Sequence, residues 1–243
     1  MMHNRKFLFA LSISTLALAA CAPMQKEVAS TRAAKPVWAF EASDVPVDPA
    51  YRFGRLPNGM RYVIRQNATP KGTAVVRMQV DAGSLDENDN ERGYAHYVEH
   101  MAFNGSTNVP EGEMVALLER HGLAFGADTN ASTGFERTTY MLDLPRNDPE
   151  LLDIALMLMR ETASELLFTP GAVERERGVV QAEMRDRNTF ALRNIEDALG
   201  FAFPGSKVAS RLPIGTAESL ANATPEGLKA FWEREYVPEH TTL

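Results

Sequence analysis

Two histidines and a glutamate lie close together in the segment Gly93-Tyr94-Ala95-His96-Tyr97-Val98-Glu99-His100-Met101-Ala102-Phe103. In a helix, His96 and His100 are one turn apart, so both imidazole rings project from the same face. Glu99 lies beside that face. Two neutral imidazoles at this spacing can bind one zinc ion, and a neighbouring carboxylate can accept a proton from a water molecule held by the metal. The segment therefore predicts a hydrolytic metal site on a helix.

A histidine and glutamate cluster on a helix can also be a solvated polar face. The residues around this cluster favour a buried helix, because most of them are apolar: Ala95, Val98, Met101, Ala102 and Phe103. Buried imidazole and carboxylate groups need partners that offset the loss of water. A metal ion would be one such partner.

A catalytic zinc ion needs a third protein ligand. The segment 173–184 contains the carboxylates Glu174, Glu176 and Glu183 and is expected to be helical. Glu176 and Glu183 are two turns apart and so share one face of that helix. Glu183 could be the third ligand, and Glu176 could support the site from behind a ligand. The spacing alone leaves open the alternative of a solvated, charged helix.

The composition is that of a globular protein with an ample core. The 243 residues are 44% hydrophobic and 23% charged. The net charge of −7 is opposite in sign to the positive charge that binds nucleic acid, so we expect no nucleic-acid partner.

The first residues resemble a bacterial lipoprotein signal. Arg5 and Lys6 precede an apolar run, 7–18, that is too short to cross a membrane, and Leu18-Ala19-Ala20-Cys21 follows. The resemblance implies removal of 1–20 and acylation of Cys21, the only cysteine, as a membrane anchor. The alternative is an ordinary signal peptide with an incidental cysteine. We expect a lipid-anchored protein of the cell envelope that faces the periplasm. Ala22 after the cysteine resembles the lipoprotein sorting signal for the outer membrane, which implies that membrane as the site of the anchor.

The rest of the chain divides into a tether, 21–48, and a folded domain, 49–243. An Asn58-Gly59 turn precedes the first predicted strand. We expect strands at 61–65, 73–83, 123–133 and 137–144, and helices at 110–121, 148–167, 170–199, 216–220 and 225–236, besides the histidine-bearing helix. These elements predict an α+β fold with a mainly antiparallel sheet. The last residues, 240–243, have the pattern of the start of a strand, so we expect a sequence truncated at its C-terminus.

Several separated motifs, in the same order, resemble the N-terminal domain of the M16 zinc metallopeptidases (insulinase, pitrilysin and the mitochondrial processing peptidase), and in particular their bacterial PqqL-like branch. The order His-x-x-Glu-His is the inverzincin signature. The resemblance extends from about Phe53 to Leu243. The other matching motifs are Leu56 to Tyr62, Gly83 to Glu87, Asn130 to Thr133, Thr138 to Tyr140, Glu174 to Glu183, Pro213 to Gly215 and Tyr236 to Pro238.

The resemblance implies a role for each candidate residue. His96, His100 and Glu183 would bind one Zn²⁺, Glu99 would be the catalytic base, and Glu176 would support the site. Asn130 and Ala131 would lie on the strand that pairs with an extended substrate. The implied partners are peptides or unfolded proteins as substrates, and further M16 domains in the same or another chain. The implied function is a zinc-dependent endopeptidase. The alternative is a non-catalytic M16-like binding or scaffold subunit, which the intact ligand set disfavours.

Overall fold

The computed structural model describes residues 38–124 and 126–243. The chain divides after Pro46 into two units, and the second, Val47–Leu243, contains the sheet and the helices discussed below. In the first unit, residues 38–46 include one short 3₁₀ helix, Ala39–Ala42. The predicted signal, 1–20, the acylated Cys21 and most of the predicted tether lie outside the described residues. Within the described ranges, no helix is long and apolar enough to cross a membrane.

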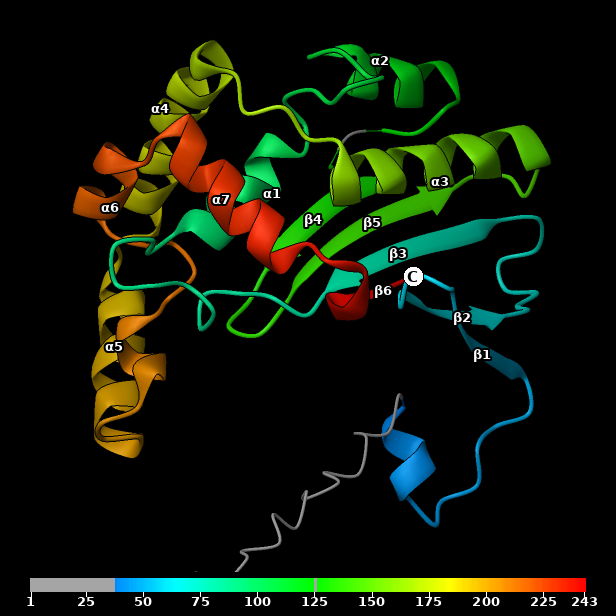
Figure 1. The fold of residues 1–243 in the computed structure, drawn as a ribbon, viewed down its shortest axis with the longest axis horizontal. Coiled ribbons are helices and arrows are strands. Elements are labelled where there is room, and N and C mark those ends of the chain that lie inside the picture. Colours follow the sequence, from blue (N-terminus) through cyan, green and yellow to red (C-terminus); the bar gives the residue numbers. More distant parts are fainter. Residues whose placement is uncertain (1–37, 125) are drawn as a thin grey trace, which may run out of the picture. The chain divides into compact units, whose positions relative to one another are not determined.

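The folded unit is built on a six-stranded sheet with the order β1-β2-β6-β3-β5-β4 (Figure 1). The strands are β1 Tyr51–Arg55, β2 Arg61–Arg65, β3 Ala74–Val80, β4 Thr129–Thr133, β5 Thr138–Leu144 and β6 Thr241–Thr242. Every neighbouring pair is antiparallel except β2 and β6. Together with the helices, this sheet confirms the predicted α+β fold.

One face of the sheet carries the core. In β5, Tyr140, Leu142 and Leu144 are buried, while the residues between them are half exposed, as in a strand with one face on the core. Met78 of β3 pairs with Tyr140 and is fully buried. The strand β4 lies at the edge of the sheet, beside β5. Its inward-facing residues therefore lie where the helices pack.

Helices cover this face in two layers. The elements are α1 Tyr94–Met101, α2 Glu113–Arg120, α3 Pro149–Ser164, α4 Pro170–Arg187, α5 Phe190–Ala202, α6 Ala217–Asn222, α7 Pro225–Glu235 and the 3₁₀ turns Lys207–Ser210 and Pro238–His240. The helices α1 and α3 pack on the sheet, and α4 and α7 pack on α1 (Figure 1). The Tyr97 hydroxyl of α1 donates a hydrogen bond to the carbonyl oxygen of Val173 in α4, which joins the two helices.

The sequence predicts four helix starts to within one residue, because the residues that cap these helices are local signals. Asp148, Thr169, Thr216 and Thr224 each accept a hydrogen bond from a backbone N–H in the first turn of α3, α4, α6 and α7. In three of these helices a proline follows the cap, where its missing N–H is harmless.

Three sequence predictions are wrong in their boundaries. The predicted helix 170–199 is two helices, because Asn188 leaves helical geometry and the Thr189 hydroxyl caps a new helix, α5. The predicted strand 123–133 is paired only from Thr129, since Asp128 accepts the N–H of Ala124 and closes a turn. The helix predicted at 110–121 begins at Glu113, after Gly112 in a left-handed conformation. The strand β1 was not predicted.

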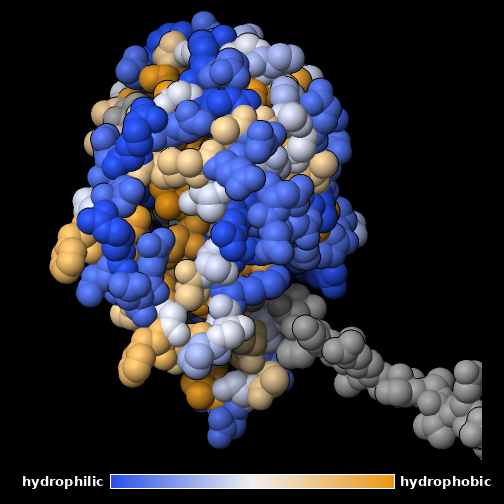
Figure 2. Space-filling model, turned by 90° about the vertical axis from the view of Figure 1, so that its left-hand side faces the viewer, coloured by the Kyte–Doolittle hydropathy of each residue, from blue (hydrophilic) through white to orange (hydrophobic). Residues whose placement is uncertain are grey.

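The helix α5 has no buried residue within the described part of the chain. Its side chains Phe190 and Phe201 are 78% and 90% exposed. Figure 2 shows the face of the molecule that carries α4, α5 and α6, with apolar and polar residues mixed at its lower end, where α5 lies. Burial of side chains within the folded unit therefore contributes little to holding this helix in place.

Candidate metal centre

The helix that bears the histidines is fixed at its first turn by buried contacts. Its N-cap, Gly93, has a φ of +91°, which glycine adopts without strain. One oxygen of the fully buried Glu87 carboxyl group accepts the N–H groups of Gly93 and Ala95, each at 3.0 Å. These bonds satisfy two N–H groups at the start of α1 that have no partner within the helix. The start of the helix, and with it His96, is thereby held in place.

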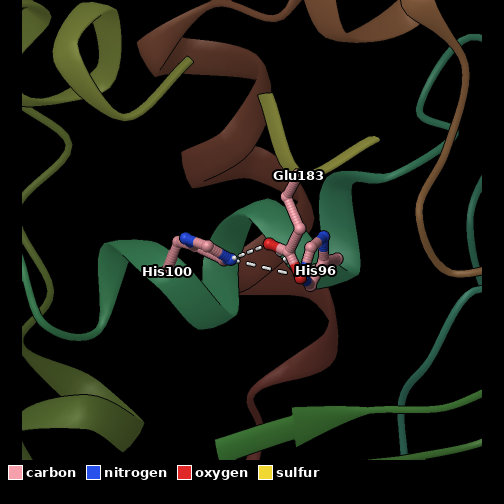
Figure 3. Close-up of side chains that lie close together, drawn as sticks. All are labelled: His96, His100 and Glu183. Carbon is pink, nitrogen blue, oxygen red and sulfur yellow. Dashed lines mark hydrogen bonds and ion pairs between the residues drawn. The ribbon is translucent and has the colours of Figure 1, made fainter. Parts of the chain in front are cut away.

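Three metal-ligating side chains meet between α1 and α4. His96 and His100 project from α1, and Glu183 reaches them from α4 (Figure 3). The Nε2 atoms of the histidines are 3.2 Å apart. Glu183 Oε2 lies 3.6 Å from His96 Nε2 and 3.3 Å from His100 Nε2. The structure thus brings together the three ligands that the resemblance implied.

The spacing of these donor atoms fits a zinc ion. In a tetrahedral site with zinc–ligand bonds of about 2.1 Å, neighbouring ligand atoms are separated by roughly 3.4 Å. The three observed separations, 3.2, 3.3 and 3.6 Å, bracket that value. Within the described residues this is the one group of three or more histidine, cysteine or acidic side chains whose ligand atoms converge in this way. Two imidazoles and one carboxylate leave a fourth position, as catalytic zinc sites do.

Glu176 contacts His100 from the side away from the other ligands. Its Oε1 lies 2.7 Å from His100 Nδ1, and its Oε2 accepts a hydrogen bond from the Asn104 amide at 2.9 Å. The same amide nitrogen also donates to the carbonyl oxygen of His100. A carboxylate at Nδ1 holds the proton there and leaves the lone pair of Nε2 for a metal. Glu176 therefore occupies the supporting position predicted for it.

The surroundings favour the metal-binding form of His96. Burial, together with smaller effects of the charges of His100 and Arg187, lowers the pKa of His96 to about 3, so the ring is neutral at physiological pH. A neutral imidazole is the form that binds zinc. For Glu176, burial alone would raise the pKa, but the hydrogen bonds from His100 and Asn104 hold it below its ordinary value. The carboxylate that supports His100 is therefore ionised.

Glu99 lies beside the ligands and is not one of them. The residue is 9% exposed, and its Oε2 accepts a hydrogen bond of 2.5 Å from the hydroxyl of Thr133 in β4. Burial raises the pKa of Glu99 above its ordinary value, against the opposing effect of the Thr133 hydrogen bond. A carboxylate with a raised pKa is a stronger proton acceptor than an exposed one. This environment suits the role of base that the resemblance implied.

The candidate residues line one cavity of about 630 Å³. His96, Glu99, His100, Glu176 and Glu183 form one part of its wall. The edge strand β4 forms another part, from Thr129 to Thr133, and this includes the predicted substrate-binding residues Asn130 and Ala131. Metal site and edge strand therefore face the same space.

Three residues near the site had no role in the sequence-based prediction. Glu87 and Thr133 belong to motifs that the sequence shows, but their contacts do not follow from spacing along one element. Thr133 of a strand contacts Glu99 of a helix, and Glu87 of a loop contacts the start of α1. Asn104 follows His100 by four residues, which is the spacing that would have placed it next to His100 on a continued helix. That spacing is the one local signal among the three.

Comparison with known proteins identifies the family. A sequence model described as insulinase (peptidase family M16) matches residues 62–202, which is more than half of the chain. The chain belongs to the M16 peptidase family. The predicted family is thereby confirmed. Similar proteins of the family are named zinc proteases, and the donor set of this chain fits a zinc ion, as predicted.

The similar proteins include bacterial M16 peptidases. A protein of Haemophilus influenzae, named probable zinc protease PqqL, is 36% identical over 83% of this chain. The Escherichia coli protein of the same name is 35% identical over 83% of this chain. In each case the match covers 22% of the relative. The chain therefore spans about a fifth of the length of these curated relatives.

Solved structures share the fold. The crystal structure of the first half of the periplasmic protease PqqL from Escherichia coli has a TM-score of 0.79 and 35% identity, covering 82% of this chain and 42% of that one. A mutant of the ferredoxin protease FusC, in complex with Arabidopsis ferredoxin, has a TM-score of 0.74 and 32% identity, covering 79% of this chain and 21% of that one. The architecture described above is therefore that of an M16 domain.

Proposed function

We propose that this chain carries the catalytic zinc site of an M16 endopeptidase, which hydrolyses peptide bonds in peptides or in small or unfolded proteins. The observation that carries the proposal is the convergence of His96, His100 and Glu183, whose ligand atoms lie within 4.8 Å of one another. Glu99 lies beside them in the same cavity. A metal site with a buried carboxylate next to it, open to a cavity, is what hydrolysis of a peptide bond requires.

His96, His100 and Glu183 would hold the zinc ion, which supplies a Lewis acid that polarises a carbonyl oxygen and makes water a nucleophile at neutral pH. Glu99 accepts a proton from the attacking water and returns it to the nitrogen of the leaving amine. Glu176 holds the Nδ1 proton of His100 through the hydrogen bond of 2.7 Å.

The edge strand β4 is the proposed site of substrate binding. In the described part of the chain no strand pairs with its outer edge, so its free backbone groups can pair with an extended polypeptide. Asn130 and Ala131 lie on this strand and line the cavity that contains Glu99. Binding through backbone groups would give affinity with limited side-chain selectivity. One similar structure is a complex of a protease with a protein, ferredoxin, which supports polypeptides as the substrate class.

The partners and the location are also proposals. Because the curated relatives are much longer than the matched region, we propose that further M16 domains, in the same or another chain, help to enclose the substrate. We further propose a lipid-anchored protein of the cell envelope. This location is supported by the lipoprotein-like signal before Cys21 and by a similar protein that is described as periplasmic.

The experiment compares wild type, Glu99→Gln and a control on metal content and peptide hydrolysis. Glu174→Gln is the control, because Glu174 lies on α4 with its side chain 74% exposed. We expect one zinc per chain in all three proteins by elemental analysis. We expect Glu99→Gln to hydrolyse a quenched fluorescent peptide at least about 100-fold more slowly than wild type, since a general base contributes on that scale.

Each other outcome contradicts part of the proposal. Loss of zinc in Glu99→Gln would mean that Glu99 is a ligand rather than the base. Full activity in Glu99→Gln would remove Glu99 from the mechanism. A wild-type chain that binds zinc but cleaves no peptide would favour the binding or scaffold subunit.

A further inference from the structure

A single hydrogen bond joins Glu99 to the sheet. The Thr133 hydroxyl donates to Glu99 Oε2 at 2.5 Å. Among the described residues, the Thr133 hydroxyl is the one group that donates a hydrogen bond to this carboxylate, and Glu99 itself is only 9% exposed. A hydroxyl that donates to a carboxylate forms a short, charge-assisted bond. The orientation of the Glu99 side chain therefore depends on one residue of a different element.

Thr133 is suited to hold a carboxylate in one position. As a β-branched residue it has few side-chain conformations, in contrast to glutamate, which has three rotatable bonds. Its strand β4 is in register with β5, where Thr133 pairs with Thr138. The hydroxyl therefore comes from a residue whose backbone is fixed by the sheet. Only one carboxylate oxygen, Oε2, is used in this bond, so Oε1 stays available for a proton.

The position of Thr133 also joins Glu99 to the proposed substrate strand. Thr133 is the last residue of β4, the strand that contains Asn130 and Ala131. All three residues line the cavity. A polypeptide that pairs with β4 would rest on the same strand that holds the base. The strand β4 would then set the distance between the substrate carbonyl and the Glu99 carboxylate.

We propose that Thr133 is a positioning residue. Its hydroxyl fixes the Glu99 carboxylate relative to β4, so that the same strand places both the base and the bound substrate. This inference rests on the proposed function, because it assigns a role within the proposed peptidase reaction. A purely structural role predicts something different, namely that the bond only stabilises the packing of α1 on the sheet.

The variants Thr133→Val and Thr133→Ser separate the two roles. Valine keeps the shape of threonine and removes the hydroxyl, whereas serine keeps the hydroxyl. Thr138→Val is the matched control, because Thr138 is the cross-strand partner of Thr133 in the sheet and is itself buried, whereas Thr133 is half-buried. The Thr138 hydroxyl donates to the carbonyl oxygen of Ala82 at 3.0 Å, and Thr138 does not line the cavity. This control therefore loses a structural hydrogen bond without disturbing Glu99.

We expect Thr133→Val to lower kcat for a peptide about 10- to 100-fold, because a misplaced catalytic group slows a reaction on this scale. Its KM should change less than about 2-fold, and it should keep one zinc per chain. In this role the Thr133 hydroxyl contacts neither a metal ligand nor the peptide. Thr133→Ser should recover kcat to within about 3-fold of wild type. Thr138→Val should have a lower melting temperature and a kcat close to that of wild type.

Crystal structures of the two Thr133 variants give a second measurement that needs no activity. Glu99 should keep its orientation in Thr133→Ser and turn away in Thr133→Val. An unchanged Glu99 in the Thr133→Val crystal would overturn the proposal, as would an unchanged kcat in that variant. So would an equal loss of kcat in Thr138→Val. Failure of the proposed function would be recognised separately, because the wild-type protein itself would then hydrolyse no peptide.

Discussion

His100 Nδ1 lies 2.7 Å from Glu176 Oε1, so a residue of α4 determines which ring nitrogen of a residue of α1 carries the proton. Glu183, seven residues further along α4, faces His100 Nε2 on the other side of the ring at 3.3 Å. One helix therefore contributes both a ligand and the support for a ligand. The relative placement of α1 and α4 is the central requirement of the metal site.

The support from Glu176 should appear as zinc affinity. In Glu176→Gln the amide is neutral and holds the Nδ1 proton of His100 less strongly, so we expect zinc affinity to fall about 10- to 100-fold. Glu174→Gln, on the same helix but with an exposed side chain, should bind zinc as wild type does. Competition with a fluorescent chelator measures the zinc affinity of both variants. Equal affinity in Glu176→Gln and wild type would show that the hydrogen bond does not tune the ligand.

Removal of Glu183, the proposed third ligand, should weaken zinc binding more than the change at Glu176. Glu183 Oε2 faces both histidines, and its other oxygen pairs with Arg187, which fixes the direction of the carboxylate. We expect Glu183→Ala to lose stoichiometric zinc at micromolar metal in elemental analysis, because two imidazoles alone do not hold a catalytic zinc ion. Retention of one zinc in Glu183→Ala would point to Glu176, the other half-buried carboxylate of this face, as the ligand.

The sequence predicts the parts of this site that depend on local spacing. His96 and His100 share a helix face because they are four residues apart, and Glu176 and Glu183 do so because they are seven apart. It does not predict contacts between elements. The bonds from Thr133 to Glu99 and from the N–H groups of Gly93 and Ala95 to Glu87 depend on how strands, loops and helices pack. The prediction missed the break between α4 and α5, although Asn188 and Thr189 at the break are residue types that commonly cap helices.

Glu87 should make the stability of the metal-free protein depend on pH. Burial raises the pKa of Glu87 to about 8, although the N–H groups of Ala95 and Gly93 lower it. In the unfolded chain the pKa is near the ordinary 4.5, so between pH 4.5 and 8 the folded state binds a proton that the unfolded state has released. The contribution of Glu87 to stability is therefore complete below pH 4.5 and is lost as the pH rises to 8.

Urea unfolding of wild type and Glu87→Gln, with a chelator present, measures this contribution. Glutamine keeps an oxygen that accepts the two N–H groups but does not titrate. Between pH 5.5 and 8.5 we expect wild type to lose roughly 1 to 3 kcal/mol relative to Glu87→Gln, within the limit of about 1.4 kcal/mol per pH unit. Glu218→Gln, an exposed change in α6, should remain parallel to wild type. Parallel curves for wild type and Glu87→Gln would mean that Glu87 is not buried as described.

The start of α1 also depends on the close approach of Gly215 to Gly93. A pair of matched substitutions can test this dependence. Gly215 has a φ of +75°, and a Cβ atom there would lie 2.6 Å from both the Gly93 Cα and the Arg92 carbonyl oxygen. Gly205 has a similar φ, +78°, but a Cβ atom there would meet no atom within 4 Å. Both alanine variants incur the strain of a left-handed backbone, about 1 kcal/mol. Gly215→Ala alone also forces two backbone segments apart, which adds about 1 to 3 kcal/mol.

We therefore expect Gly215→Ala to unfold at a clearly lower temperature than Gly205→Ala in thermal scans of the two variants. Because Gly93 is the N-cap of α1, the displaced backbone lies next to the histidine-bearing helix, and zinc affinity should fall in Gly215→Ala and not in Gly205→Ala. If both variants lost the same stability and bound zinc equally, the contact between Gly93 and Gly215 would not be a support of the metal helix. The strain of the left-handed backbone would then explain both results.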